Sequence, residues 1–105
     1  MKFLNFTMYN VDKLGTMVQV SDKIAKNPPT GYKFLAQYGC LSSPFPGVEL
    51  PPGTVVAASL IECDNPEALA SVTLELMQAG ATIHRVPIIE TTPGSAKEVM
   101  EKLKL

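Results

Sequence analysis

His84 is the one histidine in the sequence, and its side chain is the best suited of any here to proton transfer near neutral pH. It could act as a general base or as a metal ligand, although a lone histidine near the start of an edge strand is more often a surface residue. Tyr9 could also handle a proton, and Arg85 could hold an anionic substrate. His84 and Tyr9 are therefore the candidate catalytic residues.

The two cysteines, Cys40 and Cys63, are too few for a disulfide scaffold and lack the spacing of redox or zinc motifs. Cys40 could be a nucleophile if a cation such as Lys33 or Arg85 stabilised its thiolate; otherwise it packs as a small apolar residue at a strand end. We expect both thiols to be reduced. No second metal ligand stands at a recognised spacing from His84, so we expect no zinc or non-haem iron site and no cofactor. As a haem ligand, His84 would be the single candidate.

Polar residues interrupt the two segments that are expected to form central strands. Asn5, Thr7, Tyr9 and Ser59 could line a cavity that orients a small polar molecule, or they could be hydrogen-bonded groups in a wet dimer interface. The full set of candidate ligand-binding residues is Asn5, Thr7, Tyr9, Tyr38, Ser59 and Arg85.

Four segments have the alternation and the β-forming residues of strands, namely 1–9, 31–41, 54–63 and 82–91. In the first, Leu4, Phe6 and Met8 share one face, and Phe3, Asn5, Thr7 and Tyr9 share the other. In the second, one face is expected to carry Tyr32, Phe34, Ala36, Tyr38 and Cys40. Pro87 argues for a sheet edge in the last strand, because proline cannot donate to a ladder.

Helical spacing of apolar residues covers Val11 to about Lys26, and again the segment between Asn65 and Gly80. Asn10 can cap the first of these helices, and the Asp64-Asn65-Pro66 sequence can start the second. After Pro93-Gly94, Ser95 and Glu98 match a capping box, which predicts a short C-terminal helix.

This order of elements predicts a single α+β domain over residues 1–105, with a β-α-β-β-α-β chain path and a short C-terminal helix. Right-handed crossovers then give a ferredoxin-like antiparallel sheet in the spatial order 4-1-3-2, with two helices on one face. This topology should gather a set of residues at one edge of the sheet, namely Tyr9, Asn10, Tyr38, Cys40, His84 and Arg85. The Pro-rich loop 42–53 should lie beside them, as a stiffened flap or as a contact for a partner through Phe45.

The composition narrows the classes of partner. A hydrophobic fraction of 46% and a mean hydropathy of +0.13 suggest extra apolar surface for a homodimer or a higher homo-oligomer. A formal charge of −1 with scattered basic residues argues against nucleic acid, and no apolar run approaches the ~20 residues of a membrane span. We therefore expect a cytoplasmic protein that binds neither nucleic acid nor membrane.

Three stretches, MKFLNFTMY, ECDNPEALASV and HRVPIIETTP, resemble the ferredoxin-like proteins of the dimeric α+β barrel superfamily. Within it, the chain is most similar to a small domain family to which no function is assigned. The resemblance implies that two subunits pack the helix-free faces of their sheets together around a shared cavity. Relatives in the superfamily include cofactor-independent monooxygenases, isomerases and haem-binding enzymes.

Two functional hypotheses follow. The first is a small-molecule-binding or regulatory accessory protein. The second is a cofactor-independent monooxygenase or isomerase, in which His84 or Tyr9 moves a proton and Arg85 holds the substrate. The second hypothesis requires His84 and Tyr9 to face one enclosed cavity.

Overall fold

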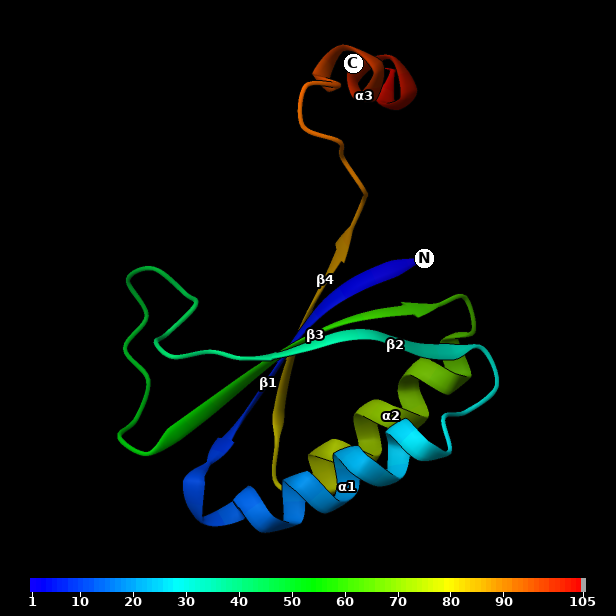
Figure 1. The fold of residues 1–105 in the computed structure, drawn as a ribbon. Coiled ribbons are helices and arrows are strands. Elements are labelled where there is room, and N and C mark those ends of the chain that lie inside the picture. The colour runs from blue at the N-terminus through cyan, green and yellow to red at the C-terminus, as the bar shows by residue number, and fades with distance from the viewer. Residues whose placement is uncertain (105) are drawn as a thin grey trace.

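The computed structural model describes residues 1–104 and shows a four-stranded antiparallel sheet in the order β2-β3-β1-β4 (Figure 1). This is the predicted order, read from the other edge, and the ferredoxin-like α+β fold is confirmed. The strands are β1 (Lys2–Asn10), β2 (Tyr32–Gly39), β3 (Thr54–Cys63) and β4 (Thr82–Ile88). The helices are the short 3₁₀ turn η1 (Val11–Lys13), α1 (Leu14–Lys26), α2 (Pro66–Gln78) and α3 (Ala96–Leu103).

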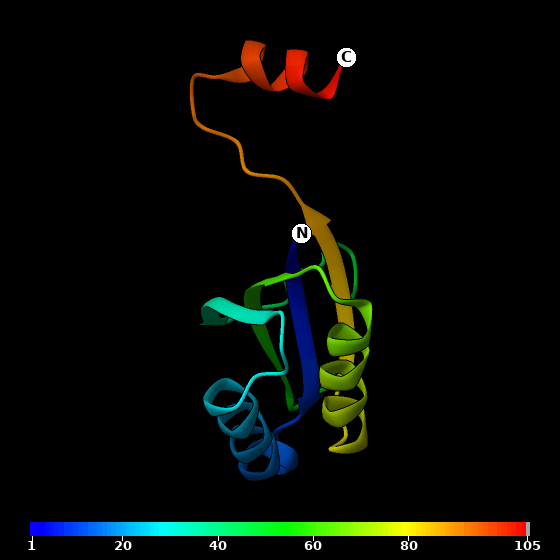
Figure 2. The same cartoon turned by 90° about the vertical axis from the view of Figure 1, so that its right-hand side faces the viewer.

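Helices α1 and α2 both cover one face of the sheet and leave the other face without helices (Figures 1 and 2). The core lies between these layers and is formed by apolar residues of the helices, β2, β3 and the residue before β4. It consists of Met17, Ile24, Tyr32, Ile61, Cys63, Ala68, Val72, Leu76 and Ala81. Because side chains alternate along a strand, Phe3 and Tyr9 of β1 pack against this core while Leu4, Phe6 and Met8 face the opposite way, as predicted.

Asparagine side chains start the first two helical segments. The Asn10 Oδ1 accepts the backbone N–H of Asp12, and the Asn65 Oδ1 accepts those of Glu67 and Ala68. Gly80 follows α2 with a φ of +109°, a conformation that favours glycine and lets the chain turn into β4. The predicted starts of both segments and the end of α2 are therefore correct.

Ser95 and Glu98 do not form the predicted capping box. The Ser95 hydroxyl donates to the backbone oxygen of Thr92 in the preceding turn, and no side-chain bond caps α3. The predicted C-terminal helix is present, although its predicted cap is not.

The prediction of which β2 residues share one face is also wrong for the second half of the strand. A β-bulge between Phe34 and Ala36 shifts the register, so that Tyr32 and Phe34 face the helices whereas Ala36 and Tyr38 face away. The bulge also brings Gln37 to the helix-covered face, because Gln37 pairs with Ser59.

Two segments extend from this body. The loop of residues 40–53, here called the flap, joins β2 to β3, and its Phe45 ring lies against the helix-free face. After β4 the chain leads away from the sheet to α3, which stands apart from the other elements (Figures 1 and 2). Within residues 1–104, no helix is long and apolar enough to cross a membrane.

Candidate functional site

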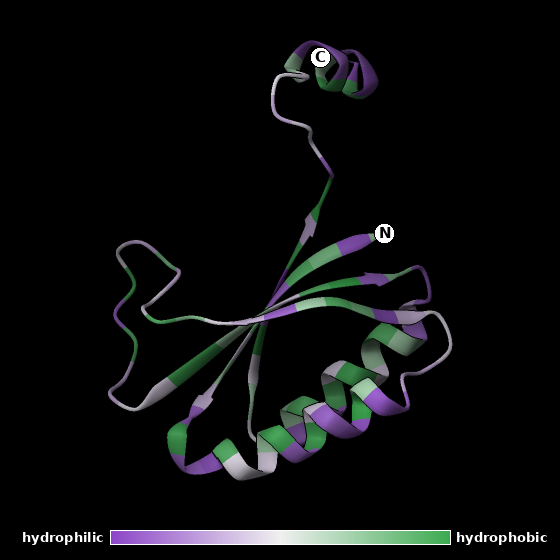
Figure 3. Ribbon diagram, viewed as in Figure 1, coloured by the Kyte–Doolittle hydropathy of each residue, from purple (hydrophilic) through white to green (hydrophobic). Residues whose placement is uncertain are grey.

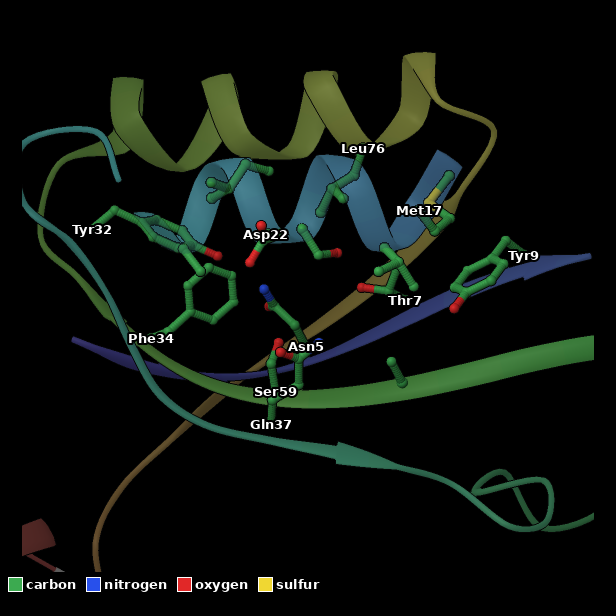
Figure 4. A pocket seen from close by; sticks show the side chains of 15 residues that line it. Asn5, Thr7, Tyr9, Met17, Asp22, Tyr32, Phe34, Gln37, Ser59 and Leu76 are labelled. Carbon is green, nitrogen blue, oxygen red and sulfur yellow. The ribbon is translucent and has the colours of Figure 1, made fainter. Parts of the chain in front are cut away.

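A pocket of about 280 Å³ lies between α1 and the sheet (Figure 4). Its floor is formed by β1, β2 and β3, and its roof is formed by α1 with one residue of α2. The lining residues are Asn5, Thr7, Tyr9, Met17, Val18, Ser21, Asp22, Ile24, Ala25, Tyr32, Phe34, Gln37, Ala57, Ser59 and Leu76. The site therefore combines aromatic and aliphatic walls with amide, hydroxyl and carboxylate groups.

The sheet register explains why polar groups meet on the pocket floor. Gln37 of β2 pairs with Ser59 of β3, Ser59 pairs with Asn5 of β1, and Asn5 pairs with Arg85 of β4. These four residues, here called the polar row, cross the whole sheet on the face that the helices cover. Asn5 and Ser59 are only 3% and 7% exposed. Burying polar groups such as these two costs free energy unless they are hydrogen-bonded, so their partners matter.

Arg85 supplies the hydrogen bonds at one end of the polar row. Its Nε donates to Asn5 Oδ1 at 2.8 Å, and its Nη2 donates to Thr73 Oγ1 of α2 at 2.7 Å. Partial burial lowers the pKa of Arg85 from its usual value, while Tyr32 and Cys63 act in the opposite direction. No carboxylate of residues 1–104 forms an ion pair with this guanidinium. Two neutral acceptors therefore orient a cation beneath α2, just outside the pocket lining.

The other side of the pocket carries a carboxylate. Asp22 of α1 points from the helix toward the part of the floor that holds Asn5, Ser59 and Gln37 (Figure 4). Its Oδ2 also pairs with Lys26 Nζ at 2.7 Å, one helical turn later. Asp22 is an exposed residue, so this carboxylate lies at the pocket mouth rather than at its base.

Tyr32 closes the end of the pocket near the start of β2. It is 3% exposed, and its ring packs edge-on against Phe34 with centroids 5.3 Å apart. Burial raises the pKa of Tyr32 to about 12, with Arg85 opposing the shift. At neutral pH Tyr32 is a neutral hydroxyl group that can donate or accept a hydrogen bond.

Four of the predicted ligand-binding residues, Asn5, Thr7, Tyr9 and Ser59, line this one pocket. Because they face the helices, they are not part of an interface formed by the helix-free face, which was the alternative interpretation. Arg85 is joined to the pocket through Asn5. Tyr38 is 62% exposed on the opposite face and takes no part.

The predicted catalytic residues do not meet within one chain. His84 pairs with Phe6 and lies exposed on the helix-free face, whereas Tyr9 packs toward the helices. His84 and Arg85 are consecutive strand residues, so their side chains point to opposite faces. The cluster expected beside the flap is therefore split between the two faces of the sheet.

His84 instead forms an aromatic cluster with the flap. The Phe45 ring lies edge-on to Phe6 at 5.1 Å and to His84 at 5.4 Å between centroids. This contact holds the flap against the helix-free face. The prediction of a flap beside Tyr9, His84 and Arg85 is correct for Phe45 and His84 only, because Tyr9 and Arg85 lie on the other face of the sheet. Cys40 begins this flap, and both cysteines are free.

Sequence reasoning missed several pocket residues. Ser21 lies on the inner side of α1, four positions after the buried Met17, so helical spacing could have found it. Asp22 borders the pocket from an exposed position, which the spacing from Met17 does not indicate. The prediction missed Gln37 because of the bulge in β2, and no residue type in the sequence indicates that bulge. Among residues 1–104, no group of three or more histidine, cysteine, aspartate or glutamate side chains is arranged to hold a metal ion.

No protein-family model and no curated protein matches the chain. Among solved structures, the C-terminal domain of the MgtC protein from Mycobacterium tuberculosis is similar with a TM-score of 0.59 and 6% identity, over 81% of this chain and 84% of that chain. An uncharacterised protein from Thermotoga maritima is similar with a TM-score of 0.57 and 10% identity, over 84% of this chain and 96% of that chain. At such identities the similarity shows the shared fold and nothing about activity.

Proposed function

We propose that the protein binds a small polar molecule in the pocket beneath α1 and serves as a binding or accessory subunit. The observation that supports this most directly is the polar row, which lies where a sheet normally presents apolar side chains to its helices. Asn5 Oδ1 accepts from Arg85 Nε, and Asn5 lines the pocket, so its amide N–H groups face the ligand space. A ligand that accepts from this amide would bind next to the arginine.

The pocket size limits the ligand class. About 280 Å³ lies just below the ~300–1,000 Å³ of typical small-molecule sites, so the ligand should be a small metabolite. Phe34 and Tyr32 suit a flat apolar portion, while Asn5, Ser59 and Asp22 suit a polar edge with both donors and acceptors. The competing monooxygenase or isomerase function loses support, because His84 lies outside this pocket.

We also propose that the protein is cytoplasmic and forms a homodimer of the dimeric α+β barrel type. The support for pairing is the helix-free face, on which Leu4, Phe6, Met8 and Leu60 are only half-buried. The support for the cytoplasm is that both cysteines are free, as in reducing compartments.

Binding is tested with native mass spectrometry of the purified protein and with thermal shifts in a library of polar metabolites. The Ala57→Leu variant places an isobutyl group in the pocket, and Ala70→Leu makes the same change on exposed α2, outside it. We expect Ala57→Leu to weaken binding of any retained or selected compound at least about tenfold, because the side chain occupies ligand space. Ala70→Leu should bind like the original chain.

Equal binding by Ala57→Leu and the original chain would contradict the pocket as the site. A chain that retains no compound and responds to none in the library would contradict the binding function itself.

A further inference from the structure

The C-terminal helix α3 presents an apolar stripe that its own chain does not cover. Ala96, Val99, Met100 and Leu103 recur at helical spacing on one side, and Met100 and Leu103 are 52% and 45% exposed. Figure 3 shows apolar and polar residues alternating around this helix, and no residue of α3 is buried. A helix of eight residues is too short to be stable in water by itself, so its stripe requires a partner surface.

The linker before α3 holds it away from its own sheet. Lys2 of β1 forms an ion pair with Glu90, two residues after the end of β4, and fixes the start of the linker at the end of the sheet. From there the chain continues away from the body (Figures 1 and 2). The molecule consequently measures 47 × 36 × 17 Å, and its radius of gyration of 15.5 Å exceeds the ~13 Å of a compact chain of this length.

The helix-free face offers a surface of matching character. The flap covers one half of this face through Phe45, which lies over Phe6 and His84. The other half contains a row with one apolar residue from each strand, here called the open row. Its members, in sheet order, are Ala36, Leu60, Leu4 and Val86. Val86 is 37% exposed and the other three are half-buried.

The dimensions of helix and row agree. A helix of eight residues is ~12 Å long at 1.5 Å per residue, and four strands at ~4.8 Å spacing measure ~14 Å from first to last. We propose that α3 of one copy lies across the open row of a second copy, and that the second copy reciprocates. This inference rests on the homodimer of the proposed function and specifies how that dimer is held.

Buried area also favours a role for α3. The open half of one sheet face is roughly 15 Å across and 13 Å along the strands, so two copies offer about 400 Å². Protruding side chains make the real surface larger than this flat area. Even twice the flat area falls short of the ~1,200–2,000 Å² that stable interfaces bury. With α3 docked, the open half of each sheet contacts the partner's helix instead of the partner's sheet, and each helix adds its own apolar stripe to the buried area.

A second copy is the occupant that covers both surfaces at once. The same chain carries an apolar helix without a cover and an apolar row without a cover. A two-fold pair buries both surfaces of both copies, because each partner supplies what the other lacks. An unrelated partner that bound the open row would leave the α3 stripe in water.

The first test compares two variants of α3 by analytical ultracentrifugation across a dilution series. Met100→Ser with Leu103→Ser removes the stripe, and Lys97→Ser with Lys102→Ser makes equivalent changes on the polar side of the helix. Lysine, methionine and leucine have similar helix propensities, so both variants weaken the helix to a similar degree. We expect the dimer dissociation constant to rise at least about 100-fold in the stripe variant only, since four apolar side chains leave the interface.

The second test places the photoreactive residue p-benzoylphenylalanine at position 100, and at position 97 as the control. Unlabelled and ¹⁵N-labelled chains are mixed before irradiation, so that cross-links between chains carry both isotopes. We expect mixed-isotope cross-links from position 100 to peptides of the sheet that contain Leu4 or Val86. Position 97 should give few.

The outcomes separate the two levels of the proposal. If the original chain dimerises but the stripe variant pairs equally well, or if all cross-links from position 100 lie within one chain, the docking of α3 is overturned while the homodimer stands. A monomer at every concentration overturns both the docking and the homodimer, and leaves ligand binding in the pocket to be judged by its own test.

Discussion

At the scale of single residues, Asn5 both lines the pocket and accepts a hydrogen bond from Arg85 beneath α2. Its oxygen accepts from Arg85 Nε at 2.8 Å, and the residue is 3% exposed. Asn5→Ala should lower the free energy of unfolding by about 1–3 kcal/mol, because the partly buried guanidinium loses an acceptor. Asn5→Asp keeps an oxygen at this place and should lose less. Urea unfolding of the two variants measures the difference, and equal losses would count against this role of the oxygen.

Tyr32 makes stability depend on pH in the alkaline range. Burial raises the pKa of Tyr32 from 10.0 to about 12, so between these values the unfolded chain loses the phenolic proton while the folded chain keeps it. The unfolded state then binds fewer protons, and the free energy of unfolding falls as the pH rises from about 10 to 12, by at most about 1.4 kcal/mol per pH unit. Below pH 10 Tyr32 contributes no such dependence.

This prediction is checked by comparing the original chain with Tyr32→Phe, which lacks the titrating group. The difference in the slope of stability against pH isolates Tyr32 from the lysines. Tyrosinate absorbance should also lose a step near pH 12 in the variant. Identical slopes in the two proteins would show that the Tyr32 hydroxyl is not shielded from water.

At the scale of elements, backbone hydrogen bonds fix the two ends of the flap, and Phe45 holds its middle against the sheet. Phe45 makes edge-on contacts with Phe6 and His84 at 5.1 and 5.4 Å. Phe45→Ala should release the flap and raise amide hydrogen exchange in residues 41–50 about tenfold, since two aromatic pairs contribute roughly 1–3 kcal/mol together. Val48→Ala removes an exposed apolar group from the same loop and serves as the control. Similar exchange in the two variants would mean that Phe45 does not anchor the flap.

The elements were largely predictable because their signals are local. Alternation located all four strands, and β3 agrees with its predicted range of 54–63. Asn10 and Asn65 marked helix starts through hydrogen bonds to backbone N–H groups two or three residues later, which the sequence places within reach. The bulge in β2 was not predictable, since it depends on how Leu35 fits between Phe34 and Ala36 against the neighbouring strand.

At the scale of the whole molecule, the site was predictable only in part. Alternation in β1 and β3 correctly grouped Asn5, Thr7 and Tyr9 with Ser59, because a strand has two faces and antiparallel pairing aligns them. It did not say which face the helices would cover. The structure gives the polar face to the helices and leaves the apolar face free, so His84 and Tyr9 lie on opposite sides of the sheet.

The order of the strands has a consequence for how the chain folds. β1 is the first strand to leave a ribosome, yet it lies in the interior of the sheet, where Lys2 pairs with Glu62 on one side and with Ile88 on the other. β1 cannot pair until β3 has been synthesised, and its second neighbour, β4, follows later still. Such distant pairing raises the contact order and slows folding relative to helical proteins of similar size. Until β4 arrives, β1 has an unpaired edge, which is a liability for aggregation during synthesis.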